Sequence, residues 1–219
     1  MASDSPPSVG SFGVPGFRFS PLSVRAGAKY VAPAGIVSAA LLARRNLAVG
    51  LPLLAITGLV AATFRHTPRL PVSDPDLLFA VAYGEILSIE PLPDGSTVVR
   101  TYLRLYDPHE VWAPTFMDIS AITVTGSRRL SAFKPEAAGQ NYQVRVETLQ
   151  GFDVTLFAGL IARAITMDVQ TGESVRPGRV LGTIHLGSGT LLRMPPGWRV
   201  IVEVGDRVRG GESVIAVRE

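Results

Sequence analysis

The residues of this chain with the most distinctive chemical potential are Gly187 and Ser188, in the run Leu186-Gly187-Ser188-Gly189. A serine hydroxyl can attack the carbonyl carbon of the residue before it, which moves the acyl group from nitrogen to oxygen. Glycine on the acyl side suits this chemistry, because the absence of a Cβ leaves the carbonyl open and permits strained backbone angles. A run this short also fits a strand that ends in a turn. The surrounding residues must therefore decide between a reactive bond and an ordinary turn.

A serine is a weak nucleophile until a base or a hydrogen-bond network activates it. His185 lies three residues before Ser188, so in a regular strand the two side chains point to opposite faces, and contact requires the chain to turn at Gly187. His109 is a second candidate base and Asp118 a candidate carboxylate. The alternative interpretation of His109 is a turn histidine exposed to solvent, and that of Asp118 is an ordinary surface charge.

The composition indicates a protein that is partly in water and partly at a membrane. Hydrophobic residues make up 47% of the 219 residues, while charged residues still reach 18%. Residues 1–70 carry seven Lys/Arg and one Asp, a net charge of +6, which leaves −3 for residues 71–219 out of the total of +3. Because the basic part is also the apolar part, we expect attraction to an anionic membrane surface.

Other classes of partner are disfavoured. No basic stripe with interleaved aromatic residues occurs, so nucleic acid is not expected as a ligand. The chain has no cysteine, which excludes disulfides, thiolate chemistry and cysteine-ligated metals. We expect no metal site.

Two apolar runs, 31–43 and 47–64, form the expected membrane anchor within residues 26–69, after a flexible tail at 1–25. The second run has 18 uncharged residues and is just long enough to cross a membrane as a helix. Either one helix crosses and the other lies along it, or the pair forms a hairpin that enters one leaflet. Two buried core helices of a soluble protein are the remaining alternative.

Basic residues close the second run. Arg65, His66 and Arg69 would hold that end at the cytoplasmic headgroups, following the positive-inside tendency. This predicts that the domain formed by residues 70–219 lies on the cytoplasmic face.

Residues 70–219 read as a mostly β domain, a sandwich or barrel, because short β-branched runs alternate with turn residues. Turns are expected at Pro93-Asp94-Gly95, at Gly151 and at Pro195-Pro196-Gly197. Residues 160–167 fit a strand or a short helix. The predicted strands are 77–82, 86–90, 97–105, 122–124, 143–148, 154–157, 179–185, 190–193, 199–204 and 213–217.

A short pattern, G-[ED]-x-V-R-x-G, occurs at 172–178 and again at 205–211. Glycines at both ends suit turns with positive φ. Lipoyl and biotinyl carrier domains use similar turns, but they need a lysine to acylate. The two lysines here, Lys29 and Lys134, both lie outside the interval between the two copies, so a carrier domain is disfavoured.

The surroundings of Ser188 resemble the C-terminal part of phosphatidylserine decarboxylases, particularly the short type. The resemblance spans about residues 30 to 219, and the paired apolar runs with residues 64–69 resemble the membrane segment of that family and its Phe-Arg-Asp-Pro-like exit. The densest matching segments are 156–163, 182–190, 204–206 and 211–216.

The resemblance implies a zymogen that cleaves itself between Gly187 and Ser188. Ser188 would become a pyruvoyl group at the start of an α chain, 188–219, and residues 1–187 would form the β chain. The pyruvoyl ketone would take the substrate amine as a Schiff base and act as the electron sink of a decarboxylase. The implied enzyme is a pyruvoyl-dependent carboxy-lyase of phospholipid biosynthesis that converts membrane phosphatidylserine to phosphatidylethanolamine and CO2.

Two positions depart from the family pattern as we align it. The family aspartate stands in a Ser-Pro-Ala-Asp-Gly-like segment, which we match to 80–85, placing Tyr83 at the aspartate position. The family histidine stands in an Asp-Val-His-Val-Asn-Arg-like segment, which we match to 116–125, placing Thr123 at the histidine position. Glu85 is a candidate replacement carboxylate. These departures favour the alternative of an uncleaved, catalytically inactive homologue that binds lipid or a partner.

Overall fold

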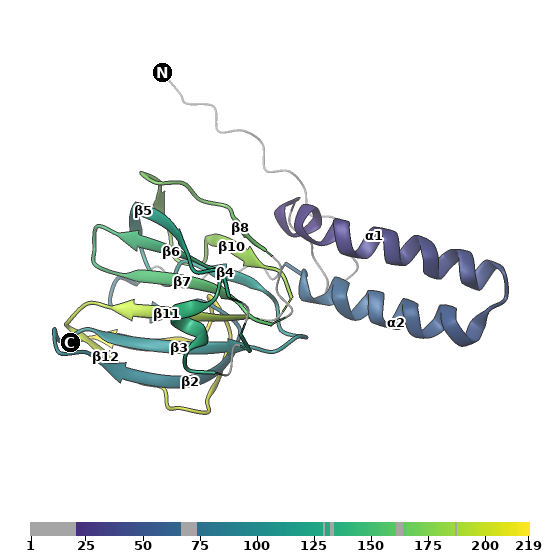
Figure 1. Ribbon diagram of the computed structural model, residues 1–219. Coiled ribbons are helices and arrows are strands. Elements are labelled where there is room, and N and C mark those ends of the chain that lie inside the picture. Colours follow the sequence, from purple (N-terminus) through teal and green to yellow (C-terminus); the bar gives the residue numbers. More distant parts are fainter. Residues whose placement is uncertain (1–20, 67–73, 129, 132–133, 161–163, 187) are drawn as a thin grey trace, which may run out of the picture.

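The computed structural model describes residues 21–66, 74–128, 130–131, 134–160, 164–186 and 188–219. Figure 1 shows two helices side by side, projecting from one end of a β domain. The C-terminus lies at the opposite end of that domain. The helices are α1 (Pro21–Ala43), α2 (Leu47–Thr63) and the short α3 (Ala137–Gln140).

The first two helices form an antiparallel hairpin whose turn is Arg44-Arg45-Asn46. Gly50 allows the helices to approach closely, because a Cβ there would lie 2.8 Å from Leu42 Cδ2. The Thr57 hydroxyl donates to the Leu53 carbonyl within α2, so this polar group is satisfied inside the helix. The two apolar runs of the sequence are therefore two helices packed against each other. Helix α1 begins at Pro21, inside the segment expected to be a tail, and residues 1–20 of that segment lie outside the described residues.

No helix in the described part of the chain has both the length and the apolar character to cross a membrane. Helix α2 ends at Thr63 after 17 residues, which is about 26 Å at 1.5 Å per residue, against an apolar layer of about 30 Å. The prediction that residues 47–64 cross as a helix is therefore wrong. Phe64, counted as the last residue of the span, instead caps α2 and packs into the β domain with 1% of its surface exposed.

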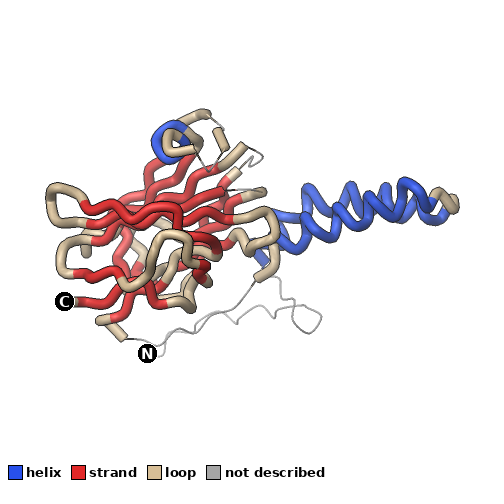
Figure 2. The backbone as a smooth tube through the Cα atoms, turned by 90° about the horizontal axis from the view of Figure 1, so that it is seen from below, coloured by secondary structure: helices blue, strands red, loops and turns tan. Residues whose placement is uncertain are grey.

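The rest of the chain is mostly β, as predicted, and Figure 2 shows its strands gathered at one end of the molecule. Three antiparallel sheets have the orders β13-β2-β3-β11-β7-β6-β5-β9, β1-β14-β12 and β4-β10-β8. The strands are β1 (Leu77–Phe79), β2 (Gly84–Pro91), β3 (Thr97–Leu103), β4 (Glu110–Trp112), β5 (Met117–Thr125), β6 (Gln143–Thr148), β7 (Asp153–Ala158), β8 (Ile165–Met167), β9 (Ser174–Val175), β10 (Val180–Ile184), β11 (Ser188–Met194), β12 (Trp198–Val200), β13 (Arg207–Val208) and β14 (Val214–Arg218).

One apolar core joins the three sheets. Leu78 of β1, Val111 of β4 and Leu192 of β11 belong to the same buried cluster. The eight-stranded sheet is open, because β13 and β9 stand at its two ends. Strand β11 lies in its interior between β3 and β7, so the start of β11 is held on both sides by backbone hydrogen bonds.

The repeated pattern supplies both edge strands of the eight-stranded sheet. One copy forms β9 between Gly172 and Gly178, and the other forms β13 between Gly205 and Gly211. All four glycines have positive φ, as the pattern predicts. The stretch that fitted a strand or a helix contains β8, and its residues 161–163 lie outside the described residues.

Candidate functional site

The backbone of Ser188 opens β11, where it pairs with Leu103 of β3 and Ala158 of β7. Gly187 lies outside the described residues. Just before it, Leu186 has a φ of 63°. A left-handed conformation costs a residue with a Cβ roughly 1–2 kcal/mol, so the backbone is strained next to the candidate scissile bond. Because the chain turns here between β10 and β11, the opposite-face argument for a regular strand does not apply to His185 and Ser188.

Gly189, on the other side of Ser188, is required by its neighbour. A Cβ at this position would lie 2.1 Å from Cζ of Phe157, a distance that the buried ring cannot accept without moving. The Phe157 ring is also covered by the guanidinium of Arg100, 5.6 Å from the ring centroid. The backbone around Ser188 is thus fixed by packing as well as by pairing.

His185 is buried next to the strained Leu186, with 1% of its surface exposed. Its Nε2 is 2.9 Å from the Thr166 hydroxyl, and its Nδ1 has no hydrogen-bond partner among the described residues. The ring meets Phe64 and Tyr30 edge-on, at centroid distances of 5.5 and 5.8 Å. Burial, together with the smaller effects of the positive charge of Lys29 and of the nearby His109, lowers the pKa of His185 to about 4. The imidazole is therefore neutral at pH 7.

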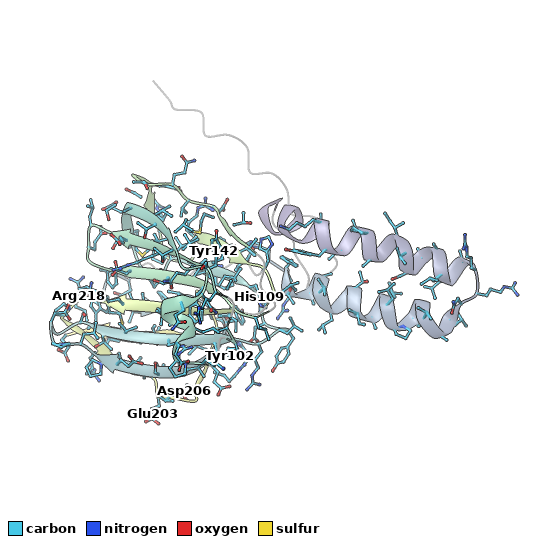
Figure 3. The ribbon with its side chains drawn as sticks, viewed as in Figure 1. Tyr102, His109, Tyr142, Glu203, Asp206 and Arg218 are labelled. Carbon is cyan, nitrogen blue, oxygen red and sulfur yellow. The ribbon has the colours of Figure 1, made fainter. Side chains whose placement is uncertain are left out.

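His109 is also fully buried, and Figure 3 places it at the end of the β domain that faces the helices. Its Nδ1 lies 2.7 Å from the Asp107 carbonyl oxygen. A carbonyl only accepts, so Nδ1 carries the proton and Nε2 is the basic nitrogen of the neutral ring. Burial lowers the pKa of His109 to about 4, against a weaker opposing effect of Asp107.

The two histidines are brought together by β10 and the strand that follows His109. Glu110 opens β4 and pairs with Thr183 of β10, and the Ile184 N–H donates to the His109 carbonyl at 2.9 Å. The end of β10 therefore carries His185 directly alongside His109. The prediction of a turn histidine in water does not hold for His109, because none of its surface is exposed.

Residues that close the second apolar run bind the β domain rather than project toward lipid headgroups. His66 Nδ1 lies 2.8 Å from a carboxylate oxygen of Glu110, whose side chain is completely buried. Arg65 donates to the Tyr106 carbonyl at 2.8 Å, and burial lowers its pKa. The expectation of headgroup contacts for these two residues is thus corrected, while Arg69 lies outside the described residues.

The candidate carboxylates stand elsewhere. Asp118, in β5, accepts hydrogen bonds from Ser174 and Gln150, which lower its pKa, at the β9 edge of the sheet. Glu85 forms an ion pair with Arg104 at 2.7 Å. Asp118 is therefore not gathered with the histidines.

The two positions matched to the family aspartate and histidine lie in different parts of the fold. Thr123 is in β5, three strands from β11 in the sheet order, or about 14 Å at 4.8 Å per strand. Tyr83 packs against Trp112 with ring centroids 5.6 Å apart, in the strand that follows His109. Of these two residues, Tyr83 therefore contacts β4, the strand that directly follows His109, whereas Thr123 lies in a distant strand.

Two surface hollows in the described part of the chain lie away from the histidines. One, of about 590 Å³, is lined by Phe152 and Trp198 near the C-terminus. The other, of about 310 Å³, is lined by Thr123 and by Arg193, which forms an ion pair with Asp94. Neither hollow includes His109 or His185, so the histidine site and these two hollows do not coincide.

Comparison with known proteins places this chain in a family. The model of the phosphatidylserine decarboxylase family matches residues 56–216. A phosphatidylserine decarboxylase proenzyme of Mycobacteroides abscessus is 32% identical over 180 residues, covering 74% of each chain. Proenzymes of the same name from Mycobacterium marinum and Mycobacterium tuberculosis are each 34% identical, covering 73% of this chain and 74% and 77% of theirs.

The chain belongs to the phosphatidylserine decarboxylase family, which confirms the resemblance seen in the sequence. The family is pyruvoyl-dependent and acts on a phospholipid, and its relatives are named as proenzymes. Sequence reasoning missed Tyr30, Phe64 and Thr166 as neighbours of the site. The signal that could have identified Phe64 is the resemblance of residues 64–69 to the exit segment of the family.

Proposed function

We propose that this protein is a phosphatidylserine decarboxylase that matures by cutting its own Gly187–Ser188 bond and then releases CO2 from phosphatidylserine to give phosphatidylethanolamine. The observation that carries the proposal is the position of Ser188, which opens an interior strand directly after the strained Leu186. Two buried, neutral imidazoles accompany that position. This combination supplies a candidate nucleophile, a strained backbone and candidate bases for attack on the preceding peptide bond.

Self-cleavage begins when the Ser188 hydroxyl loses its proton to a base and its oxygen attacks the Gly187 carbonyl carbon. The C–N bond then breaks, the Ser188 nitrogen takes up the proton from the base, and an ester with a free amine forms. Loss of the Ser188 Hα as a proton, with cleavage of the Cβ–O bond, releases a Gly187 carboxylate and leaves a dehydroalanine. Water converts this to a ketone and ammonia, so all atoms balance.

His109 is the proposed base. Its proton is held on Nδ1 by the Asp107 carbonyl, which leaves Nε2 basic. The sequence Asp107-Pro108-His109 also has the Asp-x-His spacing of the histidine segment described for the family. We therefore propose that His109, rather than Thr123, occupies the family histidine position.

The residues present fit the pyruvoyl group that the family implies. His185 Nδ1 is a buried polar atom with no partner among the described residues, and Gly189 lets the Phe157 ring pack directly against the start of β11. When formed, the ketone supplies an electron sink for the loss of CO2 from an amine substrate. His185 is proposed to hydrogen-bond within this site, and His109 to hold or move protons there.

Tyr83 supports a second candidate function, an uncleaved homologue that binds lipid. This residue stands at the position matched to the family aspartate, and a phenol does not supply a carboxylate charge. The Asp107 carbonyl already fixes the tautomer of His109, which is one task that an aspartate performs in a catalytic triad. The proposal of an active enzyme therefore stands without a carboxylate at position 83.

The hairpin is the proposed contact with the membrane. Large apolar side chains of α1 and α2 are 44% to 71% exposed, among them Ile36, Leu51 and Ile56. Arg44 and Arg45 lie at the hairpin turn and are exposed. Because these charges sit at the far end, we propose that the hairpin lies along one anionic leaflet, with the β domain on the cytoplasmic side.

Mass spectrometry of the purified chain tests the enzyme proposal. Self-cleavage should give a fragment of residues 188–219 with a blocked, pyruvoyl-bearing end, and the protein should convert phosphatidylserine in vesicles to phosphatidylethanolamine. Ser188→Ala is the matched control and should remain a single chain. A wild-type chain that stays at 23.3 kDa would support the uncleaved homologue instead.

A further inference from the structure

The base of the helical hairpin contacts the histidine site through a run of neighbouring residues. The Thr63 carbonyl accepts a hydrogen bond from the His109 N–H at 3.1 Å. Phe64 packs on the His185 ring, and His66 pairs with Glu110. A helix pair that served only as an anchor would not need such contacts with residues beside the scissile bond.

Both helices contribute to the aromatic enclosure of His185. Phe64 from the end of α2 and Tyr30 from α1 stack on each other at 6.0 Å, with their planes 17° apart. The imidazole meets both rings edge-on, at interplanar angles of 89° and 82°. Gly27 of α1 makes room for this arrangement, because a Cβ there would lie 3.0 Å from the Phe64 ring.

The enclosure leaves His185 little freedom. Thr166 binds Nε2 at 2.9 Å, the His185 N–H donates to the Ala164 carbonyl, and the aromatic edges limit rotation of the ring. The next residue is Leu186 with its positive φ. Since His185 and Leu186 share a peptide unit, holding the imidazole also holds the strained turn.

We propose that Phe64 and Tyr30 are positioning residues that hold His185, and through it the Leu186 turn, in the arrangement required for cleavage at Ser188. The base of the hairpin is then a part of the processing site. This inference rests on the proposed self-cleavage, and it adds that the membrane-facing element completes the site.

The first test measures His185 itself, in the Ser188→Ala chain, which cannot cleave. The protein has three histidines, so their imidazole NMR signals can be assigned by single substitutions. Phe64→Ala should admit water and raise the midpoint of His185 titration by at least one pH unit, whereas Phe64→Tyr should leave it unchanged. Ile56→Ala, on the exposed part of the same helix, is the matched control and should change none of the three signals.

The second test measures self-cleavage in the chain that retains Ser188. Phe64→Ala should slow the appearance of the 188–219 fragment at least tenfold. Phe64→Tyr keeps an aromatic ring at this position, and its cleavage rate should stay within twofold of wild type. Phe64→Leu fills most of the volume without a ring, and it should not restore the rate. If Phe64→Ala does not fold, Tyr30→Leu replaces it, because Tyr30 is only half-buried. This variant should also raise the midpoint of His185 titration and slow cleavage, both by less than Phe64→Ala.

The outcomes separate the two proposals. A wild-type chain that never cleaves would overturn the proposed function, while the titration in the Ser188→Ala chain still decides whether the rings hold His185. An unchanged titration and an unchanged cleavage rate in Phe64→Ala would overturn the positioning role. Full rescue by Phe64→Leu would also overturn it, because packing volume alone would then explain the effect.

Discussion

The two ends of the helical hairpin both contain apolar and basic residues, but their surroundings are opposite. The outer part carries exposed leucine, isoleucine and valine and ends in Arg44 and Arg45, whereas the base buries Phe64 and connects His66 to a buried carboxylate. The large apolar side chains of the outer part are covered by protein only in part, and 44% to 71% of their surface is exposed. The difference teaches that one element can supply both the contact with a membrane and a wall of the reactive site, and that the neighbours decide which role a residue has.

The largest expected effect comes from the buried pair at the hairpin base. Glu110→Ala should lower the free energy of unfolding by roughly 3–5 kcal/mol, because it removes the fully buried carboxylate that pairs with His66 and leaves His66 without this partner. Chemical denaturation measures this change. Glu85→Ala, which breaks the half-exposed pair with Arg104, is the matched control and should cost less than about 1 kcal/mol. Equal losses in the free energy of unfolding for the two variants would show that the pair at the hairpin base contributes no more than an ion pair at the surface.

The next effect is a dependence of stability on pH. His109 has a folded pKa of about 4, below the ordinary value of 6.5, so the unfolded chain binds the proton first as the pH falls. The stability that His109 contributes should be complete above pH 6.5 and should decrease between pH 6.5 and 4, by on the order of 3 kcal/mol for a fully realised shift. His185, whose folded pKa is also about 4, should add a loss of the same sign over the same range. Thermal unfolding at several pH values measures it, and a His109→Gln chain should show a smaller slope. A wild-type slope that His109→Gln leaves unchanged would contradict the assignment.

Adding one methyl group to a glycine should have opposite effects at the site and in the outer helix. Gly189→Ala should force the Phe157 ring to move, at a cost of roughly 1–3 kcal/mol, and should prevent cleavage at Ser188. Gly35→Ala has no atom within 4 Å of the new Cβ, and it should stabilise α1 by about 0.5–1 kcal/mol. Denaturation and fragment mass measure both variants. Normal cleavage in Gly189→Ala would show that the strand start is less tightly packed than the structure indicates.

Charges on the outer helix should change membrane binding without changing the site. The double variant Leu51→Glu/Ile56→Glu should reduce binding to vesicles at least tenfold, because each apolar side chain contributes roughly 1.5–3 kcal/mol when buried. Its free energy of unfolding should stay within about 0.5 kcal/mol of wild type. Flotation with vesicles and denaturation measure the two quantities. Unchanged flotation would place the membrane contact elsewhere.

The smallest effect concerns the basic hairpin turn. Arg44→Gln and Arg45→Gln should each weaken binding to vesicles that contain phosphatidylserine by about 1 kcal/mol, or roughly fivefold. Binding to vesicles of uncharged lipid should stay the same, and added salt should reduce the difference. Equal weakening on both kinds of vesicle would argue against an electrostatic role for these residues.

Much of the β domain was predictable from local signals. The turns at Gly95, Gly151 and Gly197 have the positive φ that glycine favours, and the hydrophobic runs between them are strands. Strand β4 was missed because its three residues are all buried, so no alternation of apolar and polar residues marks it. The length of an apolar run likewise did not decide whether α2 crosses a membrane, because its last residue, Phe64, belongs to the β domain.

The sequence by itself determined the candidate scissile bond, the family and the mostly β fold, because these depend on residues close together along the chain. The tertiary structure decided which groups accompany that bond. Residues 64, 109 and 185 are distant in sequence, and only the pairing of β4 with β10 and the docking of the hairpin bring their side chains together. Burial among them makes both imidazoles neutral, and no local pattern of residues records that burial.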